Sequence, residues 1–124
     1  MASPNRPAAG KHPRRGEVWR VNFSPSVGRE TRDEHPALVV SSDHLNASPF
    51  GVLQVIPISS SSAPLRIHVE VPAGEAGLKK LSRIKCDQLG KADLARFRPG
   101  GRLGRVRPET MQAVEAILRR LLEL

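Results

Sequence analysis

The sequence has few aromatic side chains and almost no cysteine. Its 124 residues include three Phe, one Trp and no Tyr. Folds that bind RNA by stacking bases on a sheet of exposed rings need more rings than this, so the scarcity counts against that class. The single cysteine, Cys86, excludes an internal disulfide and favours a reducing compartment, so we expect a cytoplasmic protein.

Long apolar runs and clusters of metal ligands are also missing. No run approaches the ~20 residues of a membrane-spanning helix. The first residues, MASPNRPAAGKHPRRG, lack the apolar core of a signal peptide. His44 beside Asp43 is a suggestive metal pair, but no further ligands stand at suitable spacing. We therefore expect no membrane segment, no metal site and no cofactor.

Positive charge is what the sequence has in excess. Twenty Lys and Arg against twelve Asp and Glu give a net charge of +8. This excess indicates a polyanionic partner such as a phosphate backbone or an acidic protein. Residues 1–15 hold three Pro, four basic residues and no acid, which is typical of a disordered basic tail. Residues 16–124 then form a single domain.

The apolar pattern from residue 16 onward predicts short strands and one closing helix. Residues 17–23 alternate, with Trp19, Val21 and Phe23 on one face and Arg20 and Asn22 on the other. Further strands are expected at residues 36–42, 50–58, 65–71, 81–89 and 102–106, a short helical piece at 91–97 and a helix at 108–123. This order favours a mainly β, β-rich α+β protein with a strongly bent sheet or barrel.

Six short blocks follow one another in a familiar order. They are RRGEVWRVNFSPSVGRE, HPALVVSSD, VIPISS, HVEV, GLKKLSRIKCDQL and LGRVRPETMQAVEAILRRLLEL. Together, from Arg14 to Leu124, they resemble the MazF/PemK family of toxin endoribonucleases. The resemblance implies an SH3-like small barrel of five to seven strands with a C-terminal helix, acting as a homodimer. It also implies sequence-specific, metal-independent cleavage of single-stranded mRNA, growth arrest, and an acidic cognate antitoxin that occupies the RNA groove.

The resemblance also points to catalytic residues, with two departures from the family motif. Ser59 stands where the family has Thr and keeps the hydroxyl. His35 stands where the family has Arg, and His titrates near neutrality whereas Arg does not. Either His35 transfers the proton while Arg29 or Arg32 holds the phosphate, or activity is weakened. We take His35, Ser59 and Arg32 as the candidate catalytic residues.

Five further residues are candidate RNA contacts, each with a plainer alternative. Arg29 and Glu30 lie in the charged loop before His35, and Glu30 is otherwise simply solvated. Ser60 follows Ser59 in a serine run that is otherwise a flexible linker. His68 is expected on the outward face of its strand, where a polar surface role is as probable. Gln88 is equally well explained as the end of a strand.

The favoured function is the toxin of a type II toxin–antitoxin system. Attack by the 2′-hydroxyl of RNA gives a 2′,3′-cyclic phosphate and a 5′-hydroxyl, and needs acid–base groups and fixed donors but no metal. Two alternatives stay open: a basic barrel that binds nucleic acid without cleaving it, and an interaction protein that binds an acidic partner such as the antitoxin.

Overall fold

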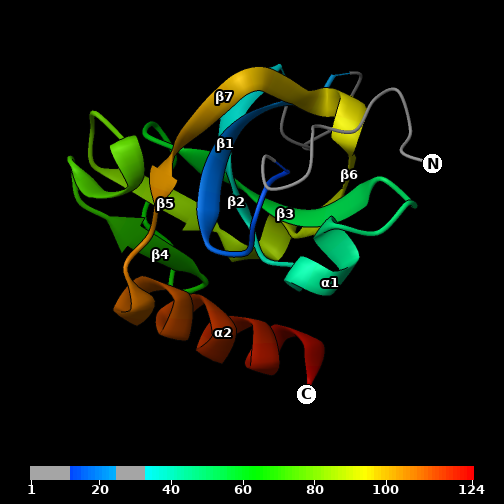
Figure 1. Ribbon diagram of the computed structural model, residues 1–124. Helices are drawn as coiled ribbons and strands as arrows, with labels where there is room; N and C mark the ends of the chain where they lie inside the picture. Colours follow the sequence, from blue (N-terminus) through cyan, green and yellow to red (C-terminus); the bar gives the residue numbers. More distant parts are fainter. Residues whose placement is uncertain (1–11, 25–32) are drawn as a thin grey trace.

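The computed structural model describes residues 12–24 and 33–124, and these residues form a curled sheet with one long helix beneath it (Figure 1). The strands are β1 (Glu17–Asn22), β2 (Glu34–Val39), β3 (Val52–Ser59), β4 (His68–Val71), β5 (Ser82–Lys85), β6 (Gly90–Asp93) and β7 (Phe97–Arg105). The helices are α1 (Asp43–Asn46) and α2 (Pro108–Leu122), with 3₁₀ turns η1 (Glu75–Gly77), η2 (Cys86–Gln88) and η3 (Leu94–Arg96).

All strand pairs are antiparallel, in the order β4-β5-β3-β2-β1-β7, with β6 added to β3. The strand β3 is central because it has three partners along its length. Its first half pairs with β6, its middle with β2, and Ile58 and Ser59 pair with β5. A strand shared in this way must bend and twist, so the sheet curls on itself. The mainly β prediction, with five to seven strands and a C-terminal helix, is confirmed.

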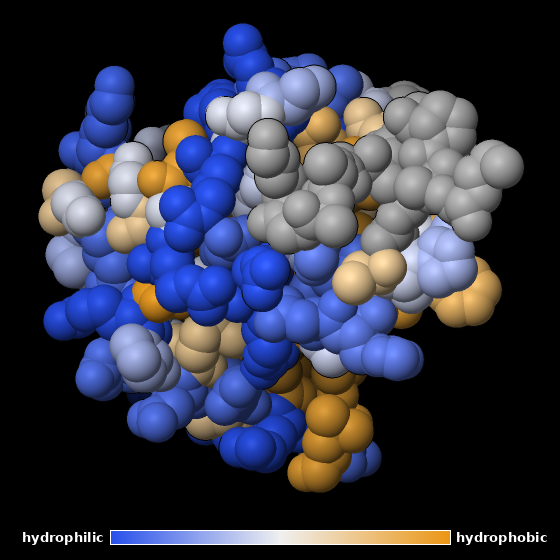
Figure 2. All heavy atoms as spheres, viewed as in Figure 1, coloured by the Kyte–Doolittle hydropathy of each residue, from blue (hydrophilic) through white to orange (hydrophobic). Residues whose placement is uncertain are grey.

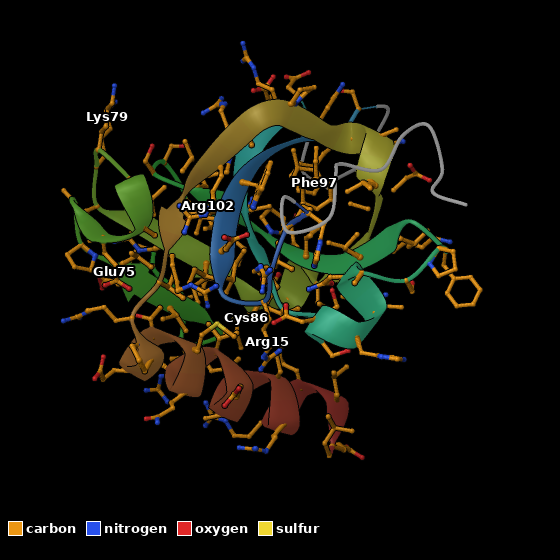
Figure 3. All side chains as sticks on the ribbon, in the orientation of Figure 1. Arg15, Glu75, Lys79, Cys86, Phe97 and Arg102 are labelled. Carbon is orange, nitrogen blue, oxygen red and sulfur yellow. The ribbon has the colours of Figure 1, made fainter. Side chains whose placement is uncertain are left out.

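Two apolar clusters fill the two faces of the curled sheet. The first packs Val18 and Leu38 with Val114 and Ile117 of α2. The second lies inside the curl and contains Trp19 and its neighbours, with the Trp19 and Phe97 rings edge to face at 6.1 Å between centroids (Figure 3). Because β1 and β2 are buried on both faces, residues 37–40 are continuously apolar rather than alternating.

The helix α2 begins with Pro108 at its first position and is capped by another element. Glu75 of η1 accepts hydrogen bonds from the Arg107 backbone N–H at 3.1 Å and from the Thr110 hydroxyl at 2.6 Å. The helix ends at Glu123, which adopts a left-handed conformation. The predicted helix at 108–123 is confirmed to within one residue.

The turn η1 is pressed against β7 where only glycine fits. A Cβ on Gly77 would lie 2.0 Å from the Leu103 carbonyl oxygen, and one on Gly104 would lie 2.6 Å from the Ala76 carbonyl carbon. Gly77 also has a φ of +74°. This contact fixes the segment after η1, which forms one wall of the site described below.

Several local predictions were wrong. The helical piece expected at 91–97 is helical only in the 3₁₀ turn η3, and residues 91–93 belong to the strand β6 because they pair with β3. The strand expected at 65–71 begins only at His68, and Leu65 is 54% exposed rather than inward. The expected strand at 102–106 is the second half of the longer β7, and α1 was not expected.

The predicted N-terminal tail meets the fold at its end. Its residues 1–11 lie outside the described part. Pro13 is buried, and Arg15 bonds the Val40 carbonyl oxygen and pairs with Glu115 of α2 at 2.5 Å (Figure 3). The last residues of the predicted tail therefore pack on the domain rather than extending from it. No helix in residues 12–24 or 33–124 is long and apolar enough to cross a membrane.

Candidate active site

A hollow of about 440 Å³ opens between the curled sheet and the segment that follows η1. It lies where β1 and β2 meet the end of β3. Its lining residues are Arg20, His35, Pro36, Ile58, Ser59, Ser60, Ser61, Gly77, Leu78, Lys79, Lys80, Ser82 and Leu103. Apart from a few apolar side chains at its base, the lining consists of cations, hydroxyls and one imidazole.

His35 occupies the second position of β2, at one edge of the hollow. Its backbone pairs with Val21 of β1, so the strand fixes its Cα while its side chain stays half-buried. Among the described residues, none makes a hydrogen bond to its ring. A half-buried imidazole on a rigid strand can meet a ligand and still exchange protons.

Ser59 ends β3 and begins a tight turn of serines. Its hydroxyl oxygen accepts a 3.2 Å hydrogen bond from the Ser61 backbone N–H and lies 3.3 Å from the Ser61 hydroxyl. Arg83 of β5 donates at 3.0 Å to the Ser62 carbonyl oxygen and so ties the far end of the turn to the sheet. Ser59 is only 9% exposed, whereas Ser60 is exposed at the rim. Hydrogen bonds thus fix the serine run as a turn, and it is not a flexible linker.

Arg20 enters the hollow from β1 and is held by a carboxylate on β2. Its Nε donates at 2.7 Å to Glu34 Oε1, the same oxygen that Arg98 Nη1 of β7 reaches at 3.1 Å. The hydrogen bonds from Arg20 and then from Arg98 hold the pKa of Glu34 below its usual value. Glu34 is therefore ionised at neutral pH, and three strands are joined at this edge of the hollow.

The opposite wall adds positive charge. Lys79 and Lys80 lie in the segment between η1 and β5, both exposed, and Lys79 extends outward from it (Figure 3). Ser82 lies beside them, and its hydroxyl donates to the Lys80 carbonyl oxygen at 2.9 Å. Within the described lining, Arg20, Lys79 and Lys80 carry permanent charge, and the carboxylate that pairs with Arg20, that of Glu34, does not itself belong to the lining. Such a hollow favours anions.

The structure brings together three of the residues predicted from the sequence. His35, Ser59 and Ser60 line one hollow, although His35 lies on β2 while Ser59 ends β3 and Ser60 follows it. Arg29, Glu30 and Arg32 lie outside the described residues. His68 and Gln88 are described but lie elsewhere: they are absent from the lining, and Gln88 ends the 3₁₀ turn η2.

The expected outward position of His68 is wrong. Its side chain is only 5% exposed, with Nε2 at 3.0 Å from Asp87 Oδ1. Its other ring nitrogen is buried without a hydrogen-bond partner in the described part of the chain. The strand alternation that suggested an outward side chain was misleading because η2, which carries Asp87, folds back on β4.

Arg20, Lys79, Lys80 and Ser82 were not among the sequence candidates. Arg20 stood out only as a polar residue between two inward ones, which normally indicates a solvated face. The two lysines sit in the block GLKKLSRIKCDQL, but nothing in the sequence places that block opposite β2. Only the curl of the sheet joins them.

The combination of side chains suits anion chemistry. Imidazole can accept or donate a proton, hydroxyls and guanidinium donate hydrogen bonds to phosphate oxygens, and ammonium groups neutralise charge. Within the described residues, no group of three or more His, Cys, Asp and Glu side chains is placed to hold a metal ion. Cys86 is buried in the core, and burial raises the pKa of its thiol to about 11. The thiol therefore stays protonated at neutral pH and is a poor nucleophile.

Comparison with known proteins gives a consistent result. Residues 14–122 match the family described as PemK-like, MazF-like toxin of type II toxin–antitoxin system. The chain is 34% identical over 96 residues to endoribonuclease MazF9 of Mycobacterium tuberculosis, covering 73% of this chain and 81% of that protein.

Solved structures agree with the sequence comparison. The fold matches the crystal structure of MazF from Deinococcus radiodurans with a TM-score of 0.79 and 25% identity, over 91% of this chain and 98% of that one. It also matches a mycobacterial endoribonuclease in complex with its cognate antitoxin, with a TM-score of 0.71 and 19% identity, over 92% of this chain and 96% of that one.

Proposed function

Because this chain belongs to the PemK-like, MazF-like toxin family of type II toxin–antitoxin systems, we propose that it is an endoribonuclease acting on single-stranded RNA. The observation that carries the proposal is the meeting of His35 and Ser59 in one basic hollow. A groove of this kind attracts a phosphate backbone, and a titratable imidazole supplies proton transfer. We place this activity in the cytoplasm, where mRNA and a reduced thiol coexist.

The reaction uses the RNA's own nucleophile. Neutral His35 takes the proton of a 2′-hydroxyl, and the 2′-oxygen forms a bond to the adjacent phosphorus. The bond from phosphorus to the 5′-oxygen then breaks, and the imidazolium returns its proton to that oxygen. The products are a 2′,3′-cyclic phosphate and a 5′-hydroxyl, with no net change in protons. Ser59 donates a hydrogen bond to a phosphate oxygen as negative charge builds on it.

The partner that restrains such a toxin is proposed to be an acidic antitoxin segment. A chain at +8 with a basic hollow is complementary to a carboxylate-rich peptide that mimics phosphates. We expect an acidic protein encoded beside this one to bind it at micromolar concentration and to block RNA cleavage. Failure to bind would dismiss that particular pair.

One experiment separates the endoribonuclease from its alternatives. Purified protein is incubated with a long single-stranded RNA in excess chelator, and binding is measured in parallel at several salt concentrations. Cleavage supports the proposal. Salt-dependent binding with intact RNA favours a non-catalytic basic barrel, and binding only to an acidic peptide favours an interaction protein.

A further inference from the structure

Arg20 is the one guanidinium among the described residues that line the hollow. Lys79 and Lys80, the other permanently charged side chains of the lining, are exposed on the opposite wall. A phosphate that gains negative charge during cleavage needs a fixed, permanently charged donor. Arg20 has the chemistry for this task and lines the same hollow as His35.

The environment of Arg20 presents the guanidinium to the hollow. Its Nε donates to Glu34 at 2.7 Å, and within the described residues neither terminal nitrogen has a partner. Glu34 Oε1 also accepts a hydrogen bond from the exposed Arg98 of β7 at 3.1 Å, and an ion pair this exposed adds little to the hold on the carboxylate. A guanidinium held at Nε presents its two terminal N–H groups as a fork, the geometry that matches two phosphate oxygens.

From this geometry we propose that Arg20 binds the scissile phosphate and that Glu34 is its positioning residue. The inference deepens the proposed endoribonuclease function and rests on it. Arg20 holds two phosphate oxygens through its terminal nitrogens, while His35 moves the proton and Ser59 donates a single hydrogen bond. The guanidinium thus supplies the permanent charge that an imidazole does not.

A matched pair of substitutions tests the role of Arg20. Arg20→Gln and Arg98→Gln each remove one positive charge and one partner of Glu34, but Arg98 is 61% exposed and does not line the hollow. We expect Arg20→Gln to lower kcat/KM by about 10²- to 10³-fold. Arg98→Gln should stay within about threefold of wild type. Equal losses in the two variants would overturn the proposal.

Conservative substitution guards against a folding defect. Arg20→Lys keeps the charge but loses the fork, so we expect an intermediate loss of about tenfold with an unchanged melting temperature.

Glu34→Gln should lower kcat by about tenfold as well. It should add nothing to Arg20→Gln in the double variant, because a positioning residue has no target once Arg20 is gone. Full additivity would contradict the positioning role.

Binding separates this inference from the proposed function. With a single-stranded 2′-O-methyl oligonucleotide, which cannot be cleaved, Arg20→Gln should weaken binding by about tenfold. It should also reduce the slope of log affinity against log salt by about 0.7, the value of one phosphate contact on a single strand. Arg98→Gln should do neither.

If wild type cleaves no RNA, the endoribonuclease proposal fails, and these binding data still decide whether Arg20 contacts phosphate. A large loss with Arg29→Gln or Arg32→Gln and none with Arg20→Gln would overturn the assignment.

Discussion

In the proposed mechanism, His35 is the residue that distinguishes this chain from a site built on arginine. An imidazole can move the proton itself, which a guanidinium does not do in proteins. We expect His35→Ala to lower the cleavage rate by about 10²- to 10⁴-fold. His35→Arg, which restores the residue of the family motif, should retain more activity than His35→Ala in single-turnover cleavage. If His35→Ala cleaved RNA at the wild-type rate, the assignment of proton transfer to His35 would be wrong.

In the proposed mechanism, Ser59 contributes less to the rate than His35 does. Ser59→Ala removes a neutral donor and also the acceptor for the Ser61 backbone N–H, which loosens the serine turn. We expect a loss of about tenfold, less than for His35→Ala, because one neutral hydrogen bond is worth about 1 kcal/mol. Ser60→Ala is the matched control, since Ser60 is exposed at the rim. A larger loss from Ser60→Ala than from Ser59→Ala would reverse their assigned roles.

At the residue scale the sequence predicted part of the site. His35 and Ser59 were named as candidates because they stand where the family motif has Arg and Thr, and the structure places both in the lining of one hollow. Arg20 could not be found, because an outward residue on an alternating strand reads as solvated until the neighbouring wall is known. The prediction for His68 was wrong for a related reason. Its place on the strand indicated an exposed side chain, but the turn η2 covers its ring.

At the scale of elements, the local apolar pattern predicted those strands and helices whose structure does not depend on pairing with distant segments. The alternation of β1 and the apolar stripe and Pro108 start of α2 are both visible in the sequence. The bending of β3 among three partners, and the strand at β6 in place of a helix, depend on pairing between distant segments. No local signal contains that information, because backbone pairing overrides modest helical propensity.

The link from η1 to α2 gives an acid-dependent stability. Burial by itself would raise the pKa of Glu75, but the Thr110 hydroxyl and the Arg107 backbone and side chain lower it below the usual value. A lowered carboxyl pKa stabilises the fold above the unfolded value of ~4.3, and the contribution is lost as pH falls through the lowered value. We expect Glu75→Gln to reduce the free energy of unfolding by about 1–2 kcal/mol at neutral pH. The difference from wild type should vanish in strong acid.

Urea unfolding at neutral and acid pH measures this effect. Glu109→Gln is the matched control, because Glu109 is an exposed carboxylate in the same first turn of α2. It should change stability by no more than about 0.5 kcal/mol. A Glu75→Gln deficit that stayed constant down to strong acid would show that the effect is steric rather than electrostatic.

At the scale of the whole molecule, exposed apolar side chains indicate self-association. Leu121, Leu122 and Leu124 are 41%, 51% and 85% exposed at the end of α2. Figure 2 shows a hydrophobic group at that end of a face that is otherwise largely hydrophilic. Because a small monomer rarely leaves such clusters uncovered, we propose a homodimer. Sedimentation equilibrium should show a mass near twice that of one chain, and a monomer at every concentration would contradict it.

The chemistry of the cleaved ends is the most direct test of the account. Wild-type protein is incubated with a defined single-stranded RNA in excess chelator, and both product ends are identified by mass spectrometry. The account predicts a 2′,3′-cyclic phosphate on the upstream fragment and a 5′-hydroxyl on the downstream fragment, with His35→Ala producing neither at a comparable rate. Intact RNA, or products that carry a 3′-hydroxyl and a 5′-phosphate, would contradict cleavage by the 2′-hydroxyl in this hollow.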